Sequence, residues 1–197
     1  MAKEKKSSKT KTPTMPERKT RRITDDKILN AINDQIVLEQ YSAQYYLAMS
    51  AWFEDKGLEG FARWYYIQHQ EELDHAMIFY NALHQFGLKP VLGAIDAPPS
   101  DYESIEDILE QTYKHEQYIT DSIHNIAQIA QECQDFKAIT LLDWFIDEQN
   151  EEEDNTSSNL ERYRLFAKEN GQALYSLDNE LGQRTYTKPQ KLVDYEA

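Results

Sequence analysis

The chain has 197 residues, of which 40% are hydrophobic and 12% aromatic, enough for one globular domain with its own core. Its single cysteine, Cys133, excludes an internal disulfide framework, and no apolar run approaches the ~20 residues of a membrane-spanning helix. The formal net charge of −14 disfavours nucleic acid and anionic membranes as partners and favours cations. We therefore expect a cytoplasmic protein.

Residues 1–22 differ in charge from the rest of the chain. They hold nine of the 21 Lys and Arg residues and two Glu, a net charge of +7, so residues 23–197 carry −21. Because this segment has almost no apolar residues and no periodic face, burial cannot offset its ordering entropy, and we predict a disordered basic tail. It lacks the apolar region of a signal peptide and the amphipathic face of a transit peptide. Met15 is an alternative start.

From Thr24 onward, apolar residues recur at alternating steps of three and four, the spacing of one helix face. Gly57 and Gly60 interrupt the pattern with a short turn, after which a second helix runs until the sequence FGLKP. The buried stripe of the first helix is Ile28, Ile32, Gln35, Glu39, Ser42, Tyr46, Met49 and Phe53, and that of the second is Phe61, Tyr65, Gln68, Glu72, His75, Phe79, Ala82 and Phe86.

Residues 87–103, GLKPVLGAIDAPPSDYE, are rich in turn residues and have no periodicity. This link is long for two helices of a compact domain. At roughly 3.3 Å per residue it can travel the ~40 Å length of a helix of nearly 30 residues. The next helix can therefore run parallel to the one before it, as in bundles with one long crossover.

A third helix is expected from Ser104, whose sequence SIED supplies a cap, and a fourth follows a tight link near Gln134. Residues 173–184 can form a short fifth helix. The third stripe is Ile105, Leu109, Thr112, Glu116, Ile119, Ile123, Ile126 and Ala130, and the fourth is Ala138, Leu142, Phe145, Gln149, Glu152, Thr156, Asn159, Tyr163 and Phe166. We predict an all-α four-helix bundle over residues 23–186, with a C-terminal tail at 187–197.

Each long helix carries a polar interruption near the middle of its apolar stripe. The residues are Glu39 on the first, Glu72 with His75 on the second, Glu116 on the third, and Gln149 with Glu152 on the fourth. In a bundle these levels can meet in one layer, where unpaired carboxylates are costly to desolvate. Two cations shared by four carboxylates and one imidazole would offset that cost. A single Glu-x-x-His occurs by chance on many helices, but coincidence on four stripes favours a di-metal site.

The chain resembles the bacterial non-haem ferritins through LEQYSAQYYLAMSAW, HQEELDHAM, QTYKHEQYIT and EQNEEE, over about Thr24 to Arg184. The resemblance implies a ferritin-like fold with two iron ions per subunit. It assigns Glu39, Glu72 and His75 to a first iron site, and Glu72, Glu116 and Glu152 to a second, with Glu72 bridging and Gln149 beside them. It also assigns Glu71, Glu148 and Glu151, with Glu152 shared, to a third site, for which a solvated inner face is an equal alternative.

Two positions separate the chain from related di-iron bundles. Where ferritin-like di-iron bundles carry a second Glu-x-x-His, the fourth helix has Gln149-x-x-Glu152, which makes the site asymmetric. Where bacterioferritins place a haem-ligating Met directly after the glutamate of the second helix, this chain has Leu73, so the resemblance implies no haem.

Tyr46 matches the tyrosine beside the ferroxidase centre of the family, or it is a plain core aromatic.

The resemblance implies iron storage with ferroxidase activity, in which Fe(II) is oxidised by O₂ or H₂O₂ and deposited as a ferric mineral inside a homo-oligomeric shell of 24 subunits. Two alternatives stay open. One is a DNA-associated or purely structural shell protein that uses the basic tail, although the acidic folded part argues against nucleic acid. The other is a di-iron peroxidase that stores little iron, which would use the same ligands.

Overall fold

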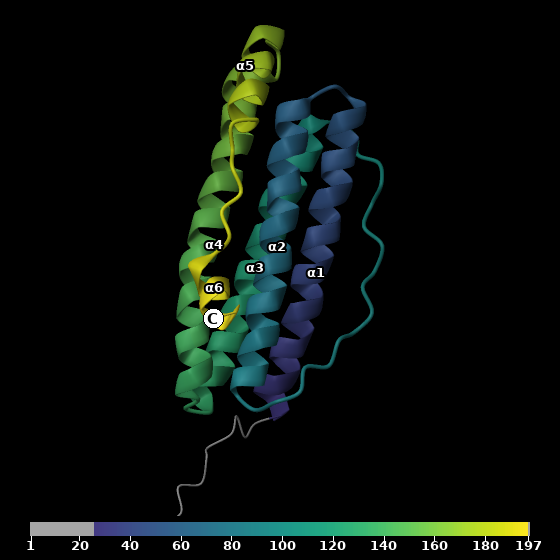
Figure 1. Ribbon diagram of the computed structural model, residues 1–197. Helices are drawn as coiled ribbons and strands as arrows, with labels where there is room; N and C mark the ends of the chain where they lie inside the picture. The colour runs from purple at the N-terminus through teal and green to yellow at the C-terminus, as the bar shows by residue number, and fades with distance from the viewer. Residues whose placement is uncertain (1–25, 197) are drawn as a thin grey trace, which may run out of the picture.

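The computed structural model describes residues 26–196, which are mostly helical (Figure 1). The elements in chain order are α1 Asp26–Asp55, α2 Glu59–Gln85, α3 Ile105–Glu132, α4 Phe136–Arg162, a π-helical turn at Tyr163–Ala167, α5 Gly171–Leu181 and α6 Gln190–Glu196. The four long helices α1 to α4 form a bundle, which confirms the predicted all-α fold class. The predicted tail at residues 1–22 and the predicted start at Thr24 lie outside the described residues.

The long link between α2 and α3 crosses from one end of the bundle to the other. In Figure 1 it runs alongside α1, so that α2 and α3 point in the same direction, as predicted from its length. It is held to α1 where the backbone N–H of Val91 donates a hydrogen bond of 2.9 Å to Oδ1 of Asn33. The bundle therefore consists of two antiparallel pairs, α1 with α2 and α3 with α4.

The ends of the helices follow local chemistry. The Ser104 side chain accepts a hydrogen bond from the backbone N–H of Asp107, as the SIED pattern predicts. The link between α3 and α4 is tight because Gln134 adopts a left-handed backbone with φ 52°, after which the Asp135 side chain caps α4. These caps satisfy backbone groups that the first turn of a helix leaves unpaired.

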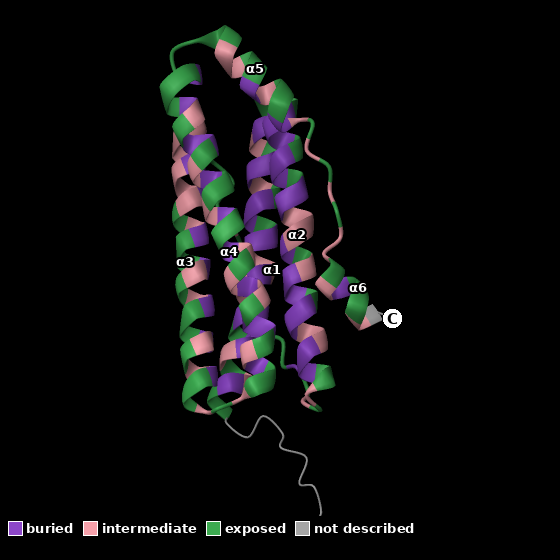
Figure 2. Ribbon diagram, turned by 90° about the vertical axis from the view of Figure 1, so that its left-hand side faces the viewer, coloured by how far each residue is buried: buried purple, intermediate pink, exposed green. Residues whose placement is uncertain are grey.

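Most of the predicted stripe residues are buried, and two apolar clusters fill the bundle (Figure 2). One cluster, around Phe79 and Phe145, occupies the end that holds the start of α1. The other, around Phe53 and Tyr65, occupies the opposite end. Between them lie buried polar side chains from all four long helices. Within the described residues no helix has the length and apolarity to cross a membrane.

The predicted stripe of the fourth helix is wrong at its last position. Phe166 is 65% exposed, and Ala167 is buried in its place. The cause is the π-helical turn at Tyr163–Ala167, in which Lys168 N–H bonds to the Tyr163 carbonyl five residues earlier. A π turn adds one residue to the helical repeat, so the buried face moves on by one position.

The C-terminal part of the chain returns along α2. Helix α5 packs against the start of α2, where a Cβ on Gly60 would lie only 1.7 Å from the Asp178 carbonyl oxygen, so only glycine fits. The Asp178 side chain also accepts a hydrogen bond of 2.9 Å from the backbone N–H of Phe61. Helix α6 then packs on α2 and buries Leu192. The segment predicted as a tail thus includes a docked helix, and the boundary at residue 186 stays a prediction.

Candidate metal centre

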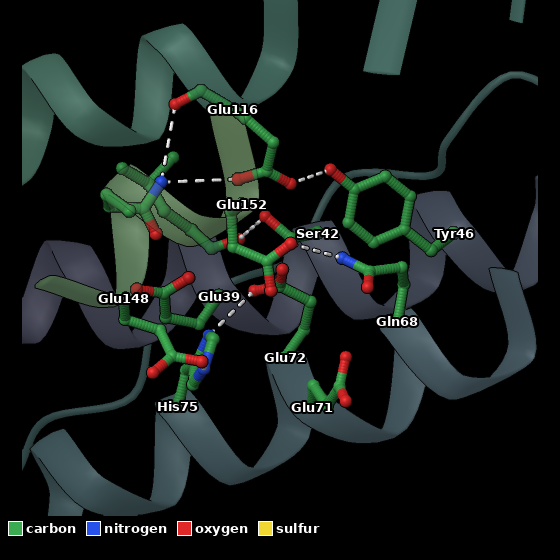
Figure 3. Close-up of polar contacts among 12 residues, drawn as sticks. Glu39, Ser42, Tyr46, Gln68, Glu71, Glu72, His75, Glu116, Glu148 and Glu152 are labelled. Carbon is green, nitrogen blue, oxygen red and sulfur yellow. Dashed lines mark hydrogen bonds and ion pairs between the residues drawn. The ribbon is translucent and has the colours of Figure 1, made fainter. Parts of the chain in front are cut away.

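Three buried side chains from α1 and α2 point toward one another in the middle of the bundle (Figure 3). Glu39, Glu72 and His75 each offer one ligand atom, and these atoms lie within 4.8 Å of one another. Glu39 Oε2, Glu72 Oε2 and His75 Nε2 are fully buried and have no hydrogen-bond partner. Buried polar atoms are rarely left unsatisfied in folded proteins. These three atoms therefore form a preorganised donor set for a cation.

The local sequence explains how this half of the centre is held. Glu72 and His75 lie three residues apart on one face of α2, with His75 Nδ1 3.5 Å from Glu72 Oε2. On α1, one turn before Glu39, the amide of Gln35 donates a hydrogen bond of 2.9 Å to Glu39 Oε1. Ser122 of α3 donates in turn to Gln35 Oε1 at 2.6 Å, which fixes the orientation of that amide. Outer partners of this kind orient metal ligands.

The α3 and α4 side of the same layer contributes Glu116, Gln149 and Glu152. The Tyr46 hydroxyl donates to Glu116 Oε1, and Gln149 Nε2 donates to Glu116 Oε2 at 3.2 Å. Gln68 Nε2 of α2 donates to Glu152 Oε2 at 2.9 Å. The carboxyl groups on this side of the centre are thus engaged by neutral donors.

Burial and mutual repulsion set the protonation of the centre. Burial, followed by the neighbouring Glu152 carboxylate, raises the pKa of Glu116 to about 8. Burial likewise raises the pKa of Glu72 well above its ordinary value. Burial lowers the pKa of His75, but the nearby Glu148 and Glu72 carboxylates outweigh it, so the net direction is strongly upward. Such a centre holds protons that a divalent cation would displace.

Tyr46 lies at the edge of this layer and is completely buried. Its hydroxyl is bonded to Glu116, while its ring packs against Tyr45, Tyr65 and His115 with centroid distances of 5.9, 6.0 and 5.8 Å. Burial, reinforced by the Glu116 charge, raises the pKa of Tyr46. The phenol therefore stays protonated and acts as a donor to the centre.

The three residues expected to form an outer site lie apart. Glu71 forms an ion pair of 2.6 Å with Arg184, while Glu148 Oε1 lies 3.8 Å from His75 Nε2. Glu151 is exposed. In Figure 3 the Glu148 carboxylate lies against the His75 ring, and the Glu71 carboxylate lies apart from both. Among the described residues, the only group of three close ligands is Glu39, Glu72 and His75, so the third site stays a prediction.

Sequence reasoning missed three supporting residues, Gln35, Gln68 and Arg184. Gln35 and Gln68 are on the predicted buried stripes, each one turn before a glutamate ligand. That position could have indicated their supporting role. Arg184 carried none, because its contact with Gln68 joins residues 116 positions apart. The predicted fifth helix included Arg184, but α5 ends at Leu181 and Arg184 lies in the segment that follows it.

Comparison with known proteins adds independent information. Residues 29–166 match the family described as Ferritin-like domain. The chain is similar to a probable bacterial non-heme ferritin-like protein of Haemophilus influenzae, with 36% identity over 157 residues that span 80% of this chain and 94% of the relative. It is also 34% identical to the bacterial non-heme ferritin of Staphylococcus aureus, over 81% of this chain and 95% of the relative.

Solved structures agree with the sequence relatives. An open pore ferritin from the hyperthermophilic archaeon Archaeoglobus fulgidus superposes with a TM-score of 0.80 at 38% identity, covering 82% of this chain and 98% of that one. A protein described as humanized archaeal ferritin superposes with a TM-score of 0.81 at 38% identity, over 83% of this chain and 98% of that one.

Proposed function

The chain belongs to the ferritin family, and on this premise we propose that it stores iron and oxidises Fe(II) to Fe(III) at its buried carboxylate layer. The observation that carries the proposal is the set of three buried ligand atoms without a hydrogen-bond partner, on Glu39, Glu72 and His75. Carboxylate oxygens with one imidazole suit iron, and the carboxylates favour the ferric product. The residues present therefore fit the substrate that family membership suggests.

Two iron ions per subunit account for the whole layer. We assign the first to Glu39, Glu72 and His75, and the second to Glu72, Glu116 and Glu152. We assign Glu72 to both sites because its carboxylate lies between the other ligands (Figure 3). Gln149 supports the second site through its hydrogen bond to Glu116. Fe(II) arriving at these ligands displaces the protons that burial retains on the carboxylates.

The ferroxidase step balances with two irons. Each Fe(II) gives up one electron, and O₂ accepts two electrons and two protons to become H₂O₂. If H₂O₂ is the oxidant, it accepts two electrons and two protons and becomes two water molecules. The residues of this chain hold the irons close together and exclude bulk water, and the Tyr46 hydroxyl supplies a hydrogen bond at the edge of the centre.

Assembly is part of the proposal. We expect a cytoplasmic homo-oligomeric shell of 24 subunits that encloses the ferric mineral, supported by the similarity to ferritins over most of the chain. The side chains of Leu165, Phe166 and Tyr175 are 72%, 65% and 63% exposed in the single chain. Exposed apolar residues gathered around the π turn and α5 are typical of a surface that another subunit covers.

One experiment tests storage and oxidation together. The purified protein receives Fe(II) in air, and its mass and iron content are measured after gel filtration. We expect a large assembly that carries far more than two irons per chain. Two irons or fewer per chain, with rapid consumption of H₂O₂, would replace storage with the peroxidase alternative. A large assembly that neither oxidises nor retains iron would leave only a structural role.

A further inference from the structure

The segment between α5 and α6 brings a positive charge to the edge of the metal centre. Arg184 Nη2 donates to Glu71 Oε2 at 2.6 Å, and its Nη1 donates to Gln68 Oε1. Its guanidinium also lies over the Trp64 ring, 4.9 Å from the centroid. The Arg184 side chain is 22% exposed and that of Glu71 17%, so the pair is largely withdrawn from solvent. Such a pair is screened much less than a surface salt bridge.

Through its contact with Gln68, Arg184 also orients Glu152, a proposed metal ligand. A guanidinium can only donate hydrogen bonds, so the amide oxygen of Gln68 must face Arg184. The amide nitrogen then faces the other way and donates to Glu152 Oε2 at 2.9 Å. Without Arg184 the amide can turn over and present its oxygen to the carboxylate. Arg184 is thus a positioning residue that acts on Glu152 through Gln68.

The contact with Glu71 withdraws a carboxylate from the metal centre. Glu71 directly precedes Glu72 on α2, yet its side chain is directed to Arg184 and away from Glu148 (Figure 3). Burial raises the pKa of Glu71 to about 7, and the Arg184 charge opposes part of that rise. A carboxylate already paired with a guanidinium must lose that partner before it can bind a cation.

The chain fixes Arg184 in place from both sides. Before it, Gly182 lies close to α2, where a Cβ on this residue would be only 3.2 Å from the Gly60 Cα. Arg63 Nε also donates to the Arg184 carbonyl at 3.0 Å. After it, the Tyr186 hydroxyl donates to Asp74 at 2.5 Å, and Leu192 is buried against the bundle. These contacts tie the segment to α2 along its length, so Arg184 is held at the centre by more than its own charge.

We propose that Arg184 is the fixed cation of the metal centre: by pairing with Glu71 and orienting Glu152 through Gln68, it limits the centre to two metal ions. The inference rests on the proposed two-iron site and names a residue that sets its stoichiometry. A third ion binds among Glu71, Glu148 and Glu151 only when Arg184 is removed or withdrawn. The guanidinium thus engages Glu71, one of the carboxylates from which the third site was predicted.

The test counts ions bound to the purified full-length apoprotein without any turnover. Co(II) is titrated under anaerobic conditions, and binding is followed by calorimetry and by Co(II) absorption bands. We expect two ions per chain for the parent protein and a third for Arg184→Gln, or a third-ion affinity raised at least roughly tenfold, within the usual range for coupled sites. Arg184→Lys keeps the charge beside Glu71 and should return the count to two.

A matched control separates this effect from a general change in charge. Arg164 forms an ion pair of 2.9 Å with Glu106, and its side chain is 42% exposed against 22% for Arg184. Arg164→Gln removes the same charge and the same kind of pair, and it should bind two ions like the parent. Thermal unfolding of each variant confirms that it is folded.

The outcomes distinguish this inference from the proposed function. If the parent binds two ions and Arg184→Gln binds the same two with unchanged affinity, the inference is wrong and the two-iron site stands. A third ion in both Arg184→Gln and Arg184→Lys would also overturn it, because charge would not be the cause. A parent protein that binds no Co(II) would remove the proposed site and this inference with it.

Discussion

The two halves of the metal centre differ in how their ligands are satisfied. On the α1 and α2 side, Glu39, Glu72 and His75 each keep a buried atom without a hydrogen-bond partner. On the α3 and α4 side, both oxygens of Glu116 accept hydrogen bonds, from Tyr46 and from Gln149. The first half is therefore ready for a cation, whereas the second must exchange existing hydrogen bonds for metal bonds. This difference predicts that the first iron site fills before the second.

The largest expected effect on Fe(II) oxidation is that of removing Glu72, the ligand that we propose both iron sites share. Glu72→Ala should lower the initial rate of Fe(II) oxidation by at least about 100-fold, the upper end of the loss from removing a supporting partner alone. The apoprotein should stay folded, because an unpaired buried carboxylate disappears. Stopped-flow oxidation and thermal unfolding measure the two effects. Glu59→Ala, at an exposed position on the same helix, is the control. Parental rates in Glu72→Ala would show that the bridge is misassigned.

The order of filling is tested by removing one ligand from each half. His75→Ala should abolish the tighter of two Co(II) binding events in an anaerobic titration, because it removes the only imidazole of the preorganised set. Glu116→Gln should leave that event in place and weaken the second by roughly tenfold or more. Loss of the tighter event in Glu116→Gln, with His75→Ala unaffected, would reverse the comparison between the halves.

The pH dependence of stability sharpens the comparison further. The pKa of Glu116 rises from 4.5 to about 8, so the folded apoprotein binds more protons than the unfolded chain between these values. The stabilisation from the neutral acid is complete below pH 4.5 and is lost as pH rises to about 8. We expect the apoprotein to lose thermal stability over this range, and the Co(II)-loaded protein to lose much less. Glu116→Gln should flatten the apoprotein curve, and an unchanged slope would exclude Glu116 as its cause.

The smallest expected effect concerns Tyr46, which donates a hydrogen bond to Glu116 on the α3 and α4 side of the centre. Tyr46→Phe should keep two Co(II) ions, because only a hydroxyl is lost from a packed ring. Glu116 then loses one hydrogen bond, a change of about 1 to 3 kcal/mol for a buried acceptor. We expect normal first-site binding and an altered decay of the absorbance that follows Fe(II) oxidation. An identical decay trace would return Tyr46 to a purely structural role.

Periodicity predicted most of this molecule because burial on a straight helix depends only on spacing. The stripes of α1 and α3 located Glu39 and Glu116 correctly in the buried layer. The same reasoning failed at Phe166, because the π turn changes the repeat and leaves no mark in the spacing before it. Arg184 was missed for a different reason: its position depends on how α5 packs at Gly60, a contact between distant parts of the chain.

The crossover between α2 and α3 also affects how the protein folds and how bound iron stabilises it against unfolding. It divides the bundle into two hairpins, α1 with α2 and α3 with α4, each of which can form from contacts close in the sequence. When the two hairpins dock, the long loop must close and the acidic layer between them must be buried. Docking is therefore the slow step of folding. An iron ion held by Glu72 and Glu116, as we propose, would join the two hairpins and should slow their separation most. Hydrogen exchange in the loaded protein should therefore slow in both hairpins together.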